Sequence, residues 1–417
     1  MPMHAIHKIL AEKSGKQEVK AGEIVNAKVD IAGINDIYLT VLISYDDMGG
    51  GKVWDPEKIV FFFDHNAPSP TIKGASNQKV MSEFAREQGI KKIFKINEGI
   101  CHSVLSESGL VKPGDIIIIT DSHTTTLGAF GAFATGVGST DLAVIMMTGE
   151  LWFRVPEVIN VKLEGTLKDG VMAKDIALHM LGELGTEFAT YKVIEYSDSV
   201  VEKLSIDERM VLCNMSVEMG AKSTYIRPNS KTIEYVKSRS HAPFIVHETD
   251  PDFIYDKEYI FNLDNLLPQV SIPDSVDNAR NIEEVEGISI DQVFIGSCTG
   301  GKLTDLEAAA NILKGKKIAE SVRLVVTPSS KEVLTKAIER GYYQTFLDAG
   351  AAITTPGCGA CFGGHSGLIA AGEKCATTSN RNFPGRMGSI EAGVYLVSPI
   401  TAAYTAITGK LNNPQYK

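Results

Sequence analysis

Three cysteines in two glycine-rich stretches constrain the fold of this chain more than any other feature. Cys358 and Cys361 stand three positions apart in "PGCGACFGGH", and Cys298 stands in "GSCTGG". Each stretch follows an apolar run, so each cysteine is predicted to lie just past the carboxyl end of a strand, where open α/β sheets bind ligands. Glycine-rich loops leave room for three thiols at one point. We therefore expect a fold in which these two distant loops meet.

The spacing of these cysteines leaves the bound group open. Three thiolates suit a [4Fe–4S] cluster with one iron left free of protein ligands. A zinc site could instead recruit His365, and a redox dithiol could use Cys358 and Cys361 alone. Cys375 could add a fourth thiolate and close the site.

The other cysteines and the composition exclude several classes of protein. Six cysteines among 417 residues are too few for a disulfide framework, and they fit a reducing compartment. Cys213 lies in an apolar helical segment and is predicted to pack in the core, whereas Cys101 has no assigned role.

Charge and hydropathy exclude two kinds of partner. A net charge of −10 without a basic stripe argues against nucleic acid. No apolar run approaches the roughly 20 residues needed to span a bilayer, and the amino-terminal residues lack the apolar core of a signal peptide. We expect a cytoplasmic protein without a membrane partner, in which a local arginine cluster binds any anionic ligand.

Short β-branched runs alternate with helical stretches, which predicts an α/β protein with largely parallel sheets. The runs are "KIVFFFDH", "GDIIIITDSH", "IDQVFIGSCTG", "VRLVVTPSS" and "AAITTPGCGAC". Between the third and fourth runs, Thr304 and Glu307 predict a helix that opens with a capping box. The polar stretch 265–285 is the expected linker. The chain length favours several domains, and we expect them at 1–156, 157–275 and 276–417.

Polar residues follow two of the other predicted strands in the same way. Asp64 and His65 come directly after the apolar run 59–63, and Asp121 follows the run 116–119. Because the carboxyl ends of parallel strands share one edge, these side chains are expected to reach the same crevice as the cysteines.

These motifs together resemble one known family. The combination of "FDH", "TDSHTTT", "GSCT", "PGCGAC" and "TSNRNFPGR" is similar to the aconitase superfamily, in particular to the large subunits of 3-isopropylmalate dehydratases and homoaconitases, from about residue 5 to residue 410. The resemblance implies three aconitase-like α/β domains around a central cleft, without a swivel domain. It also implies one [4Fe–4S] cluster per subunit, held by Cys298, Cys358 and Cys361 with one open iron.

The resemblance further implies roles for individual residues. Asp64 orients His65, which protonates the departing hydroxyl. The remaining catalytic residues would be His102, Asp121, Ser122, His123 and Glu218. The substrate-binding residues would be Asn214, Asn380, Arg381 and Arg386, because a guanidinium grips a carboxylate through two parallel hydrogen bonds.

The implied reaction is that of a hydro-lyase acting on a small hydroxy-diacid. It would interconvert 2-isopropylmalate and 3-isopropylmalate through dehydration and rehydration, a step of leucine biosynthesis. A homoaconitase or another alkylmalate dehydratase, such as one for dimethylmalate, is the alternative. A non-catalytic metal or electron-transfer protein is the alternative of a different class, but it would leave the arginines and the carboxylate–histidine pairs without a purpose.

A second polypeptide is also implied. Only 31 residues, 387–417, follow Arg386, and they are predicted to form a strand, "GVYLV", and one helix opened by Ser398 and closed by Gly409. The swivel domain of single-chain aconitases supplies a catalytic base and a substrate-reading arginine. We therefore expect a separate small subunit to dock over the cluster in a heteromeric complex.

Two places depart from the family pattern. Many relatives read T-N-G-R after the first cluster cysteine, whereas this chain has Gly300 in place of the asparagine and Lys302 in place of the arginine. Relatives often show a histidine before an aspartate near the amino terminus, where this chain has Asn35 and Asp36.

Overall fold

Residues 1–414 are described by the computed structural model of the chain. They form three large sheets of five, four and seven strands and a separate two-stranded ribbon. Strands β1 (Ile24–Lys28) and β7 (Glu150–Arg154) make the ribbon, which is antiparallel. Helix α1 (Ala5–Lys13) lies beside β1.

The first sheet has the order β4–β3–β2–β5–β6, and all of its strand pairs are parallel. Its strands are β2 (Ile31–Asn35), β3 (Ile59–Phe62), β4 (Lys92–Phe94), β5 (Ile116–Ile119) and β6 (Phe133–Gly136). The four isoleucines of β5 are all buried, as expected for a central parallel strand. The helices are α2 (Thr40–Asp47), α3 (Ile72–Gln88), α4 (Cys101–Glu107), α5 (Ser139–Thr148) and the 3₁₀ segment η1 (Ser122–Phe130).

Helix α3 shows how local sequence sets the ends of these elements. The Thr71 hydroxyl accepts a hydrogen bond of 3.0 Å from the Gly74 amide, which caps the first turn. Gly89 ends the helix in the left-handed region, with φ at 75°, where a side chain would be strained.

The second sheet has the order β10–β9–β8–β11 and is also fully parallel. Its strands are β8 (Val158–Glu164), β9 (Val193–Ser197), β10 (Ser223–Ile226) and β11 (Lys257–Asn262). Its helical segments are α6 (Ala173–Leu184), α7 (Ser199–Lys203), α8 (Ile206–Met215), η2 (Ser216–Met219) and α9 (Ser230–Lys237).

The third sheet has the order β13–β12–β18–β17–β14–β15–β16 and is parallel from β18 to β16. Its strands are β12 (Gln269–Ser271), β13 (Ala279–Asn281), β14 (Gln292–Ile295), β15 (Arg323–Val326), β16 (Ala352–Ile353), β17 (Lys374–Thr377) and β18 (Gly393–Val397). Its helical segments are η3 (Ile282–Val285), α10 (Leu303–Leu313), α11 (Lys331–Glu339), α12 (Tyr342–Ala349), η4 (Gly359–Phe362) and α13 (Pro399–Thr408).

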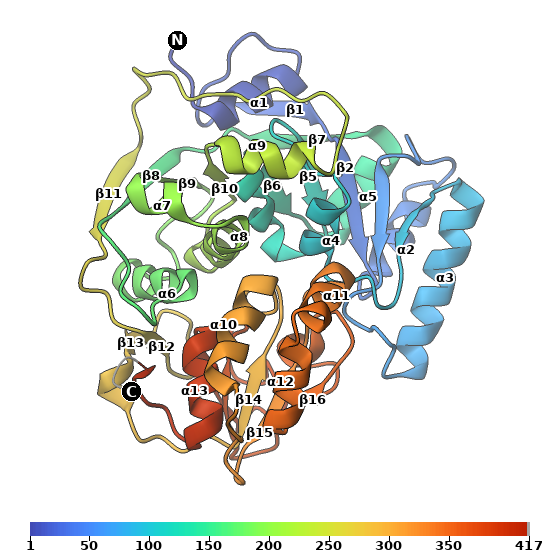
Figure 1. Ribbon diagram of the computed structural model, residues 1–417. Coiled ribbons are helices and arrows are strands. Elements are labelled where there is room, and N and C mark those ends of the chain that lie inside the picture. Colours follow the sequence, from blue (N-terminus) through green and yellow to red (C-terminus); the bar gives the residue numbers. More distant parts are fainter. Residues whose placement is uncertain (415–417) are drawn as a thin grey trace.

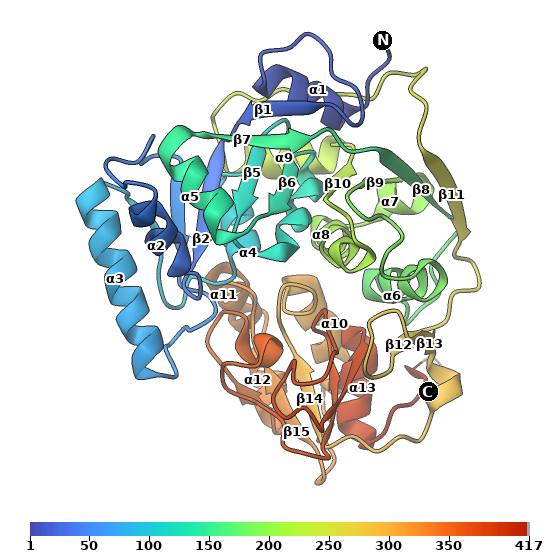
Figure 2. The same ribbon diagram turned by 180° about the vertical axis from the view of Figure 1, so that it is seen from behind.

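The three sheets pack around a shared interior. The first two lie side by side, and the third, with its helices α10 to α13, lies across from both, as the front and back views agree (Figures 1 and 2). One hydrophobic core joins residues of all three, such as Ile117, Ile194 and Phe294. Among residues 1–414, no helix combines the length and apolar character that a membrane crossing requires.

These features confirm the predicted α/β class with mostly parallel sheets, and the predicted last strand and helix appear as β18 and α13. The domain limits at 1–156, 157–275 and 276–417 remain a prediction.

Two local predictions are wrong. Helix α10 begins at Leu303, and the Asp305 carboxylate accepts the Lys302 amide, so Thr304 and Glu307 do not form a capping box. The stretch 265–285 is no simple linker, because it contains β12 and β13. Its polar composition reflects the exposure of β13 at the sheet edge.

A tight approach between the first two sheets generates a prediction. A Cβ at Gly128 in η1 would lie 2.3 Å from the backbone oxygen of Thr224 in β10. We expect Gly128→Ala to lower the free energy of unfolding by about 1–3 kcal/mol, the usual cost of overpacking. Gly138→Ala is the matched control, because a Cβ there meets nothing within 4 Å. Thermal unfolding of the two variants checks this, and equal melting temperatures would contradict it.

Candidate active site

Strands β3 and β5, which lie on either side of β2 in the first sheet, lead to a carboxylate surrounded by histidines. Asp121 follows β5, and its Oδ1 lies 3.3 Å from Nε2 of His102 and 3.4 Å from Nδ1 of His123. Its Oδ2 lies 3.7 Å from Nε2 of His65, which follows β3. Burial opposes ionisation of Asp121, but His102 and His123 outweigh it and hold the pKa of the carboxyl well below its usual value. Asp121 is therefore a buried anion shared by three imidazoles.

His65 forms a tight pair with the preceding residue. Its Nδ1 donates to Oδ1 of Asp64 over 2.8 Å, and the backbone amide of Cys101 donates to Oδ2 of Asp64 over 2.9 Å. Burial disfavours the imidazolium, but the charges of Asp64, Asp121 and Asp36 exceed that effect and raise the pKa of His65 to about 9. His65 therefore carries a proton at neutral pH.

The Asn35–Asp36 departure has a structural purpose. The Asn35 amide donates to both carboxylate oxygens of Asp64, over 3.1 and 3.0 Å, while its oxygen accepts from the Thr120 hydroxyl over 2.8 Å. Asp36 accepts the backbone amide of His65 over 3.2 Å. The pair thus holds Asp64 and the loop of His65 in place. Sequence reasoning missed this role, although Asn35 ends β2 and Asp36 follows it at the shared sheet edge.

The three cysteines meet at the other side of the crevice. Cys298 follows β14, and Cys358 and Cys361 follow β16; they are 6%, 8% and 4% exposed. The Asn380 amide donates to the Cys298 sulfur over 3.3 Å, and the Cys361 thiol donates to the Asn380 oxygen over 3.5 Å. Two of the three sulfurs therefore contact one side chain.

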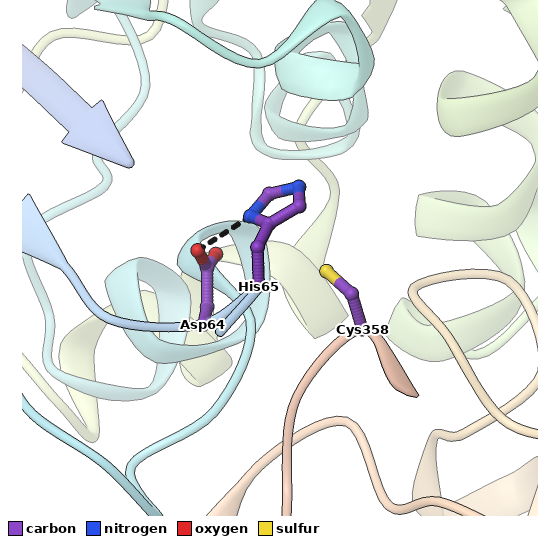
Figure 3. Close-up of side chains that lie close together, drawn as sticks. All are labelled: Asp64, His65 and Cys358. Carbon is purple, nitrogen blue, oxygen red and sulfur yellow. Dashed lines mark hydrogen bonds and ion pairs between the residues drawn. The ribbon is translucent and has the colours of Figure 1, made fainter. Parts of the chain in front are cut away.

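The third sulfur faces the histidines. Ligand atoms of Cys358, His65 and Asp64 all lie within 4.8 Å of one another, and the sulfur points toward the pair from the facing loop (Figure 3). The backbone amide of Cys358 also donates to the Asp64 carbonyl over 3.0 Å. The cysteine loops of the third sheet and the acid residues of the first sheet thus form one site.

The alternative fourth ligands do not join this group. Cys375 lies in β17 and pairs with Gln292 at the start of β14, whereas Cys298 lies beyond the opposite end of β14. His365 already binds through both ring nitrogens, to the Pro68 carbonyl over 2.7 Å and to the hydroxyl of the next residue over 2.8 Å.

The remaining two cysteines, Cys101 and Cys213, are also buried. Cys213 lies fully buried in the core, as predicted. Cys101 is also buried, and its sulfur lies 3.5 Å from Nδ1 of His102, so it lines the histidine side of the site. No sequence pattern beyond its adjacency to His102 indicated that position.

The loop after Cys298 explains the missing asparagine. A Cβ at Gly300 would lie 1.9 Å from the Thr378 hydroxyl, so a side chain does not fit there. The Asn380 side chain, from another loop, donates its amide to the Cys298 sulfur. Asn214 holds Asn380 in turn, accepting its amide over 3.2 Å. Asn214 and Asn380, predicted to bind substrate, are fully buried against the cysteines.

A second network connects Arg381 to the histidines. Nε of Arg381 donates to Oε1 of Glu218 over 2.8 Å, and Nη2 donates to the Ser122 hydroxyl over 3.1 Å. The same Glu218 oxygen lies 2.8 Å from Nε2 of His123. Burial acts against the charged form of Glu218, but His123 and Arg381 prevail and lower its pKa. Arg381 is thereby held rigidly at the edge of the site.

Arg386 has unused hydrogen-bonding capacity. Its Nη2 lies 3.8 Å from the Cys361 sulfur, and its Nε is buried without a partner among the described residues. Tyr38, which sequence reasoning missed, belongs to the same region. Burial raises the pKa of Tyr38, followed by the charge of Asp121, while Arg381 and Arg386 oppose that rise. An anion bound at Arg386 would satisfy its free donor.

The donor set fits an iron–sulfur cluster. Burial raises the pKa of the Cys298 thiol to about 12 and that of Cys358 well above its usual value. Bound metal deprotonates such thiols outright, and thiolate ligands favour iron–sulfur clusters or zinc. The side chains of Asn380 and Arg386 donate toward the sulfurs of Cys298 and Cys361, which suits thiolate ligands.

Comparison with known proteins agrees with this geometry. The model of the aconitase family (aconitate hydratase) matches residues 8–287 and 278–409. The 3-isopropylmalate dehydratase large subunit 1 of Methanopyrus kandleri is 49% identical, with 98% of each chain covered. That of Pyrococcus furiosus is also 49% identical, over 99% of this chain and 98% of the relative. A probable methanogen homoaconitase large subunit of Methanothermobacter thermautotrophicus is 46% identical, over 99% and 98%.

A solved structure supports the fold. The holo form of aconitase X from Thermococcus kodakaraensis superimposes with a TM-score of 0.50 and 14% identity, covering 90% of this chain and 89% of that one. Sequence family, fold and the arrangement of polar residues at the strand ends thus agree. The chain belongs to the aconitase family.

Proposed function

We propose that this chain is the large subunit of a cytoplasmic 3-isopropylmalate dehydratase, a hydro-lyase of leucine biosynthesis. It interconverts 2-isopropylmalate and 3-isopropylmalate with one [4Fe–4S] cluster held by Cys298, Cys358 and Cys361. The observation that carries the proposal is the juxtaposition of the buried Cys358 sulfur with the Asp64–His65 pair, within 4.8 Å. The full-length similarity to dehydratase large subunits supports the same substrate class.

The residues of this chain divide the work of binding and proton transfer. When bound, the cluster supplies a Lewis-acidic iron that polarises the departing hydroxyl. Nε2 of His65 points away from Asp64 and holds the proton for the leaving oxygen. Arg386 binds a substrate carboxylate through its free donors, and Ser122 and Arg381 form the facing wall.

The base that removes the carbon-bound proton comes, in this proposal, from a small subunit. The relatives that cover 98% or more of this chain are named as large subunits. The heteromeric complex would close the cleft over the cluster, exclude water and supply the arginine that reads the substrate side group. Homoaconitase is the second candidate, because a homoaconitase large subunit is nearly as similar as the dehydratases.

Reconstitution with candidate small subunits tests the function. The chain, purified anaerobically with its cluster, is assayed on 2-isopropylmalate, homocitrate and citrate, alone and with each partner. We expect no turnover from the chain alone and turnover of 2-isopropylmalate with a dehydratase small subunit. If homocitrate is the only one of the three substrates that is turned over, the chain is instead a homoaconitase large subunit. Full activity without any partner would refute the two-subunit proposal, and a colourless zinc protein would refute the cluster.

The acid role of His65 is tested by substitution. We expect His65→Asn to lower kcat of the complex by about 10²–10⁴, the usual contribution of a general acid, with iron content unchanged. His241→Asn is the control, because His241 is exposed and remote from the cysteines. Unchanged kcat in His65→Asn would assign the proton to another of the histidines around Asp121.

A further inference from the structure

A buried lysine lies behind the cysteines. Lys174, the second residue of α6, is 1% exposed. Its Nζ donates to the backbone oxygens of Ser379 over 2.5 Å and Thr378 over 3.2 Å. The Thr299 hydroxyl lies 3.4 Å from Nζ, and the Met215 sulfur lies 3.5 Å away. The ammonium thus links the second sheet to two loops of the third.

These contacts place no negatively charged group within hydrogen-bond distance of Lys174. Its four polar partners are two carbonyls, a hydroxyl and a thioether, and none is a carboxylate. The adjacent Asp175 is turned to the backbone amides of Met172 and Gln269, over 2.8 and 2.9 Å. A buried ammonium is expensive unless an anion pairs with it. The negative charges that favour this ammonium therefore act from beyond hydrogen-bond distance.

The cysteines are one source of negative charge near Lys174. Burial lowers the pKa of Lys174 to about 8, and this effect is opposed by negative charge on Cys298 and Cys361 and then by the carboxylates of Asp305 and Glu218. Thr299 directly follows Cys298, so Lys174 contacts the cysteine loop itself. Three thiolates around a cluster leave a net negative charge in a buried place, which an ammonium at this distance would stabilise.

We propose that Lys174 is a positioning residue that balances the thiolate charge of the loaded site and fixes the loop that carries Asn380 and Arg381. This inference rests on the proposed function only in requiring the cluster. The two carbonyls that Lys174 binds immediately precede Asn380, the side chain that contacts two cysteine sulfurs. The Lys174 side chain thus both balances the charge of the cysteine ligands and holds the loop of Asn380 in place.

The test compares the reduction potential and stability of loaded variants. Lys174→Met removes the charge but keeps a side chain of similar length, and Lys174→Arg keeps the charge. Lys168→Met is the control, because it removes the charge of an exposed lysine. We expect Lys174→Met to lower the equilibrium constant for reduction of the cluster at least tenfold. For a one-electron couple, this shifts the reduction potential by about 59 mV to a more negative value. Its melting temperature should fall more with the cluster bound than without it. Lys174→Arg and Lys168→Met should stay near the wild-type potential.

The opposite results are equally definite. If Lys174→Met leaves the reduction potential unchanged and lowers the stability of the loaded and cluster-free proteins equally, Lys174 only holds the loop in place. If Lys174→Met does not fold, Lys174→Gln, which keeps a donor without the charge, provides the same comparison. A wild-type chain that binds no cluster would overturn the proposed function and this inference together. A cluster-containing chain that stays inactive on every diacid when each small subunit is present would overturn the proposed function alone.

Discussion

Burying three thiols in one site is the constraint on which the rest of this structure depends. Two of them resist ionisation, because burial raises the pKa of Cys298 to about 12 and that of Cys358 well above its usual value. A site that needs all three as thiolates must bring cationic and donor groups around them. Asn380, Arg386 and Lys174 lie there, from loops and a helix of different sheets. The three sheets therefore have to direct their loops to one interior.

The acid side of the site follows from a second buried anion. Asp121 is flanked by His65, His102 and His123, and His123 also contacts Glu218. In a low-dielectric interior, the hydrogen bonds of such a network strengthen one another, and the network fixes which atom holds each proton. Ligand atoms of His65 and Cys358 lie within 4.8 Å of each other, so the histidine network of the first sheet and a cysteine loop of the third sheet border one site.

The sequence predicted the parts of the site that have a local signal. Asp64 and Asp121 each follow an apolar strand, and parallel strand ends share an edge, so their convergence could be expected. Asn35 and Lys174 were not found, because their partners lie across the fold and no spacing encodes such contacts. A signal existed for Lys174: it stands among apolar positions of a helix, with Ala177 and Leu178 on its face, where a lysine is rarely buried without purpose.

The central claim, that three cysteines hold a cluster whose fourth position is free of protein ligands, is tested most directly by Mössbauer spectroscopy and iron analysis after anaerobic reconstitution. The account predicts about four iron atoms per chain in the wild type and in Cys375→Ser, with one iron spectroscopically distinct and easily lost. Cys298→Ser should fail to hold this cluster. Loss of the cluster in Cys375→Ser, with retention in Cys298→Ser, would contradict the account.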